Sequence, residues 1–141
     1  MKYIPISSPR LPGLFFVVDD EWGAVCLAKH WNMGTRYPYF ACGPKTNRHH
    51  MRAHSFVLPP TSGMVVDHKD GDVFNNTISN LELVTHIVNT QRAHANRPAI
   101  RGVRYSKVLG KWCVFARNAA GCKLLSTHSL LSDAMIARAS V

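Results

Sequence analysis

The sequence predicts an α+β protein made of a small β-rich lead-in, a compact centre and a separate C-terminal unit. Three observations support this prediction. Short β-prone runs alternate with proline and glycine breaks in residues 1–60, and a strand, a long polar loop, a strand and a helix follow in residues 61–96. Residues 97–141 then give three strand-like runs and an alanine-rich helix, which predicts a three-stranded antiparallel sheet with one helix.

The lead-in is expected to consist of short strands and turns. Pro5, Pro9 and Pro12 break any early helix, and residues 14–18 form the first strongly β-prone run. An aromatic stretch follows at residues 37–40. Residues 54–58 are strand-like and stop at two prolines, which end the lead-in.

The centre carries its own start and stop signals. Residues 64–66 form a short β-prone run that leads to Asp67-His68, and residues 69–72 have the composition of a turn. Residues 81–84 fit a second strand. Thr85 is a suitable N-cap for a helix over residues 86–94, which ends before Pro98.

The C-terminal unit is predicted to follow a linker at residues 95–100. Its strands lie at residues 102–106, 111–117 and 122–127, joined by Gly110 and a turn at residues 118–121, and its helix lies at residues 132–139. In the second strand, even positions such as Trp112 and Val114 are expected to face the helix. Odd positions such as Cys113 and Phe115 are expected to form an open face.

Charge points to a polyanionic partner. The chain has a formal net charge of +9, divided into +4 for residues 1–60, −2 for residues 61–96 and +7 for residues 97–141. The longest apolar run, residues 14–18, is far shorter than the roughly 20 residues that span a bilayer, so we expect no membrane segment and no signal peptide. The cysteines show no zinc-site spacing, which favours reduced thiols in a cytoplasmic protein.

The residues with the clearest chemical potential lie in the centre. His68 at a strand end can act as a general base, and Asp67 and Asn89 offer oxygen atoms to a hard divalent cation. Asn80 lies between them in the chain. The same spacing is also met by an ordinary turn, because aspartate, glycine and asparagine collect in loops for backbone reasons.

The stretch between residues 65 and 89 contains, in order, Asp67-His68, Asp70-Gly71, Asn75-Asn76, Ser79-Asn80-Leu81, Val84-Thr85 and Asn89. This pattern resembles the HNH nuclease family, in particular the phage homing endonucleases. The resemblance extends upstream to residues 15–20, Trp31 and residues 54–58. Thr77 and Glu82 stand where members often carry arginine.

The resemblance implies a ββα-metal nuclease core that hydrolyses DNA. His68 would activate water, Asp67 and Asn89 would bind one Mg²⁺ or Mn²⁺, and Asn80 would hydrogen bond within the loop and hold His68 in position. His54 matches a common family position. We assign it to a structural or phosphate-contacting role, with metal binding as the alternative.

The C-terminal unit has a pattern of residues at 101–105, 110–112, 121–123 and 125–127, together with Arg117 and Ala134. This pattern resembles the ERF-type (Apetala-two) DNA-binding domain. The resemblance implies that Arg101, Arg104 and Arg117 contact DNA from the open sheet face, with Lys123 as a further contact, and a sheet of this size fits the major groove. A small domain that is basic only for solubility has the same pattern.

The sequence therefore predicts a metal-dependent DNA endonuclease that acts on double-stranded DNA. It is expected to be a phage homing endonuclease that works in the host cytoplasm as a monomer or weak dimer, without a small-molecule cofactor. The alternative is a DNA-binding regulator or packaging accessory with an inactive HNH fold.

Overall fold

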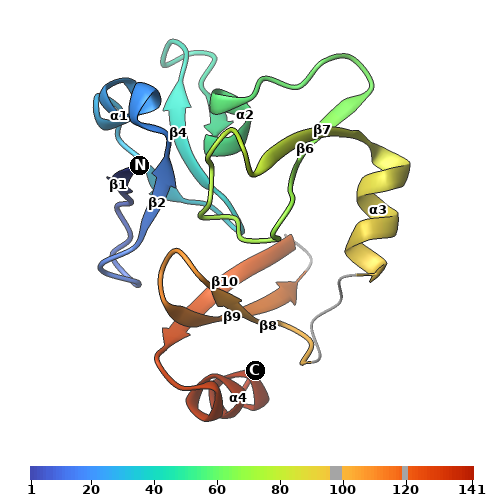
Figure 1. Cartoon of the computed structure of the whole chain (residues 1–141). Helices are drawn as coiled ribbons and strands as arrows, with labels where there is room; N and C mark the ends of the chain where they lie inside the picture. Colours follow the sequence, from blue (N-terminus) through green and yellow to red (C-terminus); the bar gives the residue numbers. More distant parts are fainter. Residues whose placement is uncertain (96–99, 119–120) are drawn as a thin grey trace.

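The computed structural model describes residues 1–95, 100–118 and 121–141, and it has four small antiparallel sheets and four helices in this part of the chain (Figure 1). This architecture confirms the predicted α+β class. Residues 96–99 of the predicted linker at 95–100 and residues 119–120 of the predicted turn at 118–121 lie outside the described residues. No described helix is long and apolar enough to span a membrane.

The lead-in contains two sheets packed around aromatic rings. Strand β1 (Lys2–Pro5) pairs with β2 (Phe15–Val18), and β3 (Asn32–Met33), β4 (Pro38–Cys42) and β5 (His49–Arg52) form the second sheet. The Trp31 ring meets Phe16 and Phe40 edge to face, with centroids 4.8 and 5.0 Å apart. These rings are almost fully buried, so they form the main apolar core of the lead-in.

Two helices in the lead-in differ from the prediction of strands and turns alone. Helix α1 (Asp20–Leu27) starts with Asp20 and Glu21 in its first turn, where negative charge favours a helix N-terminus. Helix α2 (Ala53–Val57) replaces the predicted strand at residues 54–58, which is therefore wrong. Ala53 and Val57 are buried one helical turn apart, so packing of that face overrides the β propensity of the segment.

The order of elements in the centre is confirmed. Strand β6 (Met64–His68) pairs with β7 (Leu81–Thr85), with Asp67 opposite Glu82, and helix α3 (His86–Ala95) follows at once. The Thr85 hydroxyl oxygen accepts a hydrogen bond of 3.3 Å from the Val88 amide, which is the predicted N-cap. The identity of this unit as a ββα-metal core stays a prediction.

The loop of residues 69–80, between β6 and β7, is attached to the lead-in. The Val17 amide donates to the Phe74 carbonyl and the Asn76 amide donates to the Val17 carbonyl, both at 2.9 Å. The Ile78 amide donates to the Asp19 carboxylate at 2.7 Å. Strand β2 and the start of α1 therefore fix the position of this long loop.

The C-terminal unit has the predicted strands and helix. Strands β8 (Val103–Ser106), β9 (Lys111–Asn118) and β10 (Gly121–His128) form one sheet with β9 in the middle, and α4 (Leu131–Ala139) covers one face (Figure 1). Val114 of β9 is buried with Val103 and Ala134. The prediction that even positions of β9 face the helix is therefore confirmed.

The opposite face of this sheet is not open, which corrects the prediction. Cys113 and Phe115 are only 1% and 8% exposed, and they belong to the same apolar cluster as Val73 and Phe74 of the loop at residues 69–80. The physical reason is that large apolar side chains at alternate positions gain free energy by leaving water. The C-terminal sheet consequently packs against the centre of the molecule.

A buried carboxylate strengthens this junction. Asp72 accepts hydrogen bonds from the Ser106 hydroxyl at 2.8 Å and from the Val108 amide at 3.2 Å, both on one oxygen. Its other oxygen accepts from the Phe74 amide at 3.1 Å. Because each oxygen has a donor, the charge can stay buried at the contact between the centre and the C-terminal unit.

Candidate functional site

One pocket brings together three of the predicted site residues. Asp67 and His68 come from the end of β6, Asn89 comes from α3, and all three line a pocket of about 390 Å³ that we call the His68 pocket. The antiparallel pairing of β6 with β7, and the immediate start of α3 after β7, set the strand end against the helix. Residues distant in the sequence thus face one cavity.

A neighbouring asparagine fixes the His68 ring. His68 Nε2 lies 3.1 Å from the side-chain oxygen of Asn76, and the Asn76 side-chain nitrogen donates to the Val73 carbonyl at 3.2 Å. Because the Asn76 oxygen can only accept, His68 Nε2 must carry the proton in this contact. In the neutral ring, Nδ1 then keeps the lone pair that a base requires.

The surroundings keep His68 neutral. Burial is the largest effect and lowers the pKa of His68 below its ordinary value of 6.5, while the Asn76 contact and the nearby carboxylates of Asp70 and Asp67 act in the opposite direction. A buried imidazole with a lowered pKa is unprotonated at neutral pH. It is therefore in the form that accepts a proton.

Asn80 binds the loop rather than the histidine. Its side-chain nitrogen donates to Asp70 Oδ1 at 2.9 Å and to the Asn75 carbonyl at 2.8 Å, and its side-chain oxygen accepts from the Asp70 amide at 3.1 Å. The loop so held includes Asn76, the residue that contacts His68 Nε2 directly. The sequence analysis did not single out Asn76, because Asn75, Asn76 and Asn80 look alike in the sequence.

His54 is buried, so it cannot contact DNA directly in this structure. It is 6% exposed, and its ring meets the rings of Tyr37 and His68 edge to face, with centroids 4.7 and 5.2 Å apart. Burial lowers the pKa of His54 to about 3, with the charge of His68 as the next largest cause. The phosphate-contacting role is therefore corrected to a structural one, beside the general-base candidate.

Arg92 is a site residue that the sequence analysis missed. Its guanidinium lies 3.5 Å from Asp67 Oδ2 and also binds Glu82, the residue opposite Asp67 in the β6–β7 pair. Arg92 follows Asn89 by three positions in α3 and therefore shares its helix face. That spacing is the signal that could have identified it.

The donor atoms in the pocket fit a hard divalent cation. Asp67 supplies a carboxylate and Asn89 an amide oxygen, the ligand types that Mg²⁺ and Mn²⁺ prefer. In the described residues, no group of three or more His, Cys, Asp or Glu side chains could hold a metal. Two protein ligands are compatible with Mg²⁺, which commonly keeps several waters and binds substrate phosphate as well.

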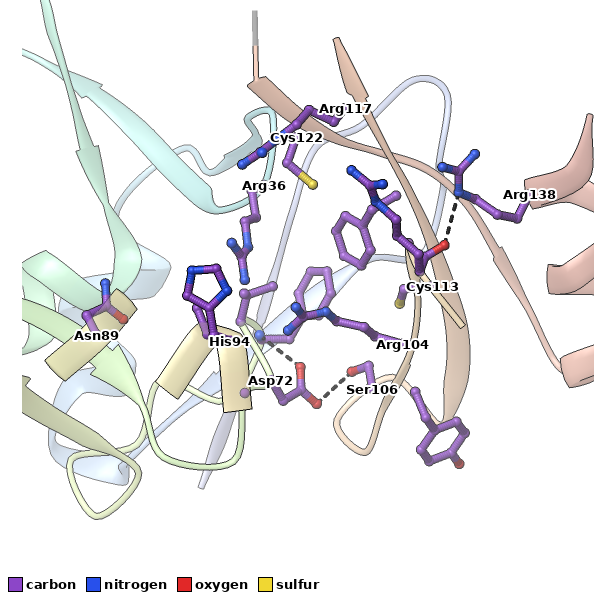
Figure 2. Close-up of a pocket in the computed structure, with 18 of the residues that line it drawn as sticks. Arg36, Asp72, Asn89, His94, Arg104, Ser106, Cys113, Arg117, Cys122 and Arg138 are labelled. Atoms are coloured by element: carbon purple, nitrogen blue, oxygen red, sulfur yellow. Dashed lines mark hydrogen bonds between the residues drawn. The ribbon is translucent and has the colours of Figure 1, made fainter. Parts of the chain in front are cut away.

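The predicted DNA contacts line a second, larger pocket. Arg101, Arg104 and Arg117 surround a space of about 780 Å³ between α3 and the C-terminal sheet, which we call the junction pocket (Figure 2). Arg36 and Arg138 also line it, and the sequence analysis had not selected either residue. The structure thus brings three of the four predicted C-terminal contacts together.

Lys123 does not join this group. It pairs with Ala116 in the β9–β10 ladder, whereas Arg117 pairs with Cys122, so Lys123 points to the face that α4 covers. Its side chain is partly buried there. A shared DNA-contacting surface with Arg104 and Arg117 is therefore inconsistent with the register of the sheet.

Comparison with known families gives a match to part of the chain. The HNH endonuclease family model matches residues 58–91, a stretch that includes Asp67, His68, Asn80 and Asn89. No curated protein and no solved structure matches the chain. The family match supports a nuclease that hydrolyses nucleic acid, with DNA as the substrate that this family implies.

Proposed function

We propose that this protein is a divalent-metal-dependent DNA endonuclease in which His68 is the general base. The observation that carries the proposal is the His68 pocket, where a neutral histidine of fixed orientation lies beside two oxygen ligands. General-base catalysis and metal-ion catalysis are the two effects that phosphodiester hydrolysis requires most. The HNH endonuclease match over residues 58–91 supports the same chemistry.

His68 would remove a proton from the attacking water. Asn76 holds the proton on Nε2, so Nδ1 accepts the proton from water as the oxygen attacks phosphorus. His54 and Tyr37 pack against the ring and limit its movement. The residues around His68 therefore serve to keep one nitrogen unprotonated and in place.

Asp67 and Asn89 would hold the metal ion. A bound Mg²⁺ or Mn²⁺ supplies positive charge to the phosphate and to the leaving 3′ oxygen. Two contacts hold Asp67 in the pocket: its Oδ1 accepts the His68 amide at 2.9 Å, and its Oδ2 lies 3.5 Å from the Arg92 guanidinium. Arg92 places a further permanent positive charge beside the site where phosphate charge would develop.

The biological setting that we propose follows the resemblance to phage homing endonucleases. The C-terminal unit would act as an ERF-type DNA-binding module, and the protein would cut double-stranded DNA in the host cytoplasm as a monomer or weak dimer. One such site hydrolyses one phosphodiester at a time. A monomer would therefore nick DNA, and cutting both strands would require two copies or two successive events.

The test is cleavage of supercoiled plasmid by the full chain with Mg²⁺ or Mn²⁺. We expect nicking that stops on chelation, and a loss of about 10²–10⁴-fold in rate for His68→Ala, which is the usual size of a general-base contribution. The control variant is His30→Ala, because His30 is an exposed histidine outside both pockets. It should cut at the native rate.

Two results would reject the proposal. Equal cutting by His68→Ala would remove His68 from the mechanism. A gel shift of DNA by the native chain without any nicking in either metal would favour the alternative, a DNA-binding regulator or packaging accessory with an inactive HNH fold.

A further inference from the structure

The His68 pocket and the junction pocket are connected. Six residues line both of them, so the wall of one continues into the wall of the other. Two of the six are arginines that come from opposite sides, Arg36 from the lead-in and Arg104 from β8. The full shared set is Arg36, Gly71, Val73, Asn89, Ala93 and Arg104.

Arg36 and Arg104 line both pockets, and neither forms an ion pair with a carboxylate of the described residues. Both are partly buried, and burial together with the charge of Arg36 lowers the pKa of Arg104. In the described part of the chain, the carboxylates that form ion pairs are Asp20, Asp67 and Glu82, and none of them pairs with either arginine. The two positive charges therefore repel each other in a partly dehydrated place.

Asp72, the one acidic residue among the described residues that line the junction pocket, forms no ion pair with either arginine. Asp72 is 8% exposed, and its two oxygens are occupied by donors from Ser106, Val108 and Phe74. Figure 2 shows the contact between Asp72 and Ser106 below the guanidinium groups of Arg36 and Arg104. The positive charge of the pocket is consequently available to an external anion.

An aromatic ring holds the Arg36 side chain, and the C-terminal sheet fixes the backbone of Arg104. The Arg36 guanidinium lies 5.4 Å from the centre of the Tyr37 ring, a cation–π contact. Arg104 is in the middle of β8, opposite Cys113 of β9. Holding two like charges close together is unfavourable in the free protein and becomes favourable when a phosphate binds between them.

We propose that Arg36 and Arg104 together bind one backbone phosphate of the DNA strand that His68 cuts, next to the scissile phosphate. This inference rests on the proposed function and adds a phosphate site built from the lead-in and the C-terminal unit together. The junction pocket is lined by three further arginines, Arg101, Arg117 and Arg138. Such a row of charges suits the successive phosphates of a strand better than a single small anion.

The test measures DNA binding separately from cleavage. The full chain carrying His68→Ala is titrated, in the presence of chelator, with a short fluorescent DNA duplex of arbitrary sequence. In this background, Arg36→Ala and Arg104→Ala should each weaken binding about tenfold, the usual effect of losing a charged hydrogen-bonding partner. Arg10→Ala is the matched control, because Arg10 is exposed and lines neither pocket.

Two further measurements test whether the arginines share one phosphate. The loss in the double variant should be smaller than the product of the single losses, because the two sites are coupled. The slope of log affinity against log salt should fall by about 0.9 in the double variant, as expected for one phosphate contact. If the fold loss of the double variant equals the product of the single losses and the salt slope falls by about 1.8, the arginines contact separate phosphates. This result would overturn the proposal.

Further variants and outcomes distinguish a lost phosphate contact from a folding defect, and the phosphate site from the nuclease proposal. Arg36→Lys keeps the charge and the alkyl chain, so it should fold like the native chain and lose binding partly. Binding equal to that of Arg10→Ala in all four variants at Arg36 and Arg104 would refute the shared site, whether or not the native protein cuts DNA. A native chain that never cuts, with variants that still lose binding as expected, would retain the phosphate site and reject only the nuclease.

Discussion

The loop of residues 69–80 and the adjacent junction pocket use their polar side chains in opposite ways. In the loop, Asp70, Asn75 and Asn80 hydrogen bond to one another and to the backbone, so the segment is satisfied without a ligand. In the pocket, Arg36 and Arg104 have no carboxylate partner among the described residues. The side chains of the first region thus hold its own shape, whereas the second has the uncompensated positive charge that the proposed phosphate site requires.

The largest effect on the loop is expected from Asn80→Ala. It removes three hydrogen bonds of a buried side chain and leaves their partners unpaired, so the free energy of unfolding should fall by about 2–4 kcal/mol. Urea denaturation measures this change. Ser79→Ala, at an exposed neighbouring position, should change it by less than about 0.5 kcal/mol. Equal values for the two variants would contradict a loop held by its own side chains.

The next prediction concerns how the free energy of unfolding depends on pH through His54. Among the described residues, His54 Nδ1 is the one buried side-chain nitrogen or oxygen without a hydrogen-bond partner. The pKa of His54 is about 3 in the folded protein and about 6.5 in the unfolded chain, so below pH 6.5 the unfolded chain binds the proton first. Stability should therefore fall with decreasing pH between 6.5 and 3, by up to about 1.4 kcal/mol per pH unit.

The His54→Phe variant isolates this contribution. Its ring has a similar shape and does not titrate, so the free energy of unfolding should depend less steeply on pH across the same range. Urea denaturation at several pH values provides the measurement. His30→Phe, at an exposed position, should keep the native slope. Parallel curves for the native chain and His54→Phe would show that His54 titrates normally.

A smaller effect is expected where the two regions meet. Ser106→Ala removes the hydroxyl that donates to Asp72, and a lost bond to a charged acceptor should lower the free energy of unfolding by about 1–2 kcal/mol. Chemical denaturation of this variant is compared with that of Ser132→Ala, which changes an exposed serine of α4. If both variants have native stability, Asp72 does not depend on this contact.

The smallest effect should come from Lys123. Its side chain lies on the sheet face opposite Arg117, so Lys123→Ala should change DNA affinity less than about twofold, while Arg117→Ala should weaken it several-fold. A binding titration of both variants against the same duplex makes the comparison. A larger loss for Lys123→Ala would mean that DNA contacts the α4 side of the sheet.

The parts of the fold that were predicted from the sequence have local signals. The β-prone run at residues 64–66 and the capping hydroxyl of Thr85 mark β6 and the start of α3, and both are observed. Helix α2 was missed because its formation depends on buried contacts of Ala53 and Val57 with distant residues. The covered face of β9 had a signal, two large apolar side chains at odd positions, that was outweighed by the arginines around them.

In the candidate site too, features with a local sequence signal were predicted, and features that depend on distant contacts were not. The spacing of Asp67, His68 and Asn89 predicted residues that do line one pocket. The contact between Asn76 and His68 could not be predicted from the sequence. It depends on the hydrogen bond that the backbone amide of Asn76 donates to the Val17 carbonyl of the lead-in. Arg36 is also far away in the chain, and only the packing of the lead-in against the C-terminal unit brings it near Arg104.

The shared apolar cluster of Phe74 and Phe115 limits how this protein can be divided. A chain truncated after α3 would expose Phe74 to water and leave Asp72 without its Ser106 donor, so a minimal nuclease fragment should aggregate or unfold. Exchange of the C-terminal sheet for a different domain faces the same obstacle. A successful chimera would need apolar residues in place of Cys113 and Phe115 and a hydroxyl that reaches Asp72. The centre and the C-terminal unit therefore have to be redesigned together.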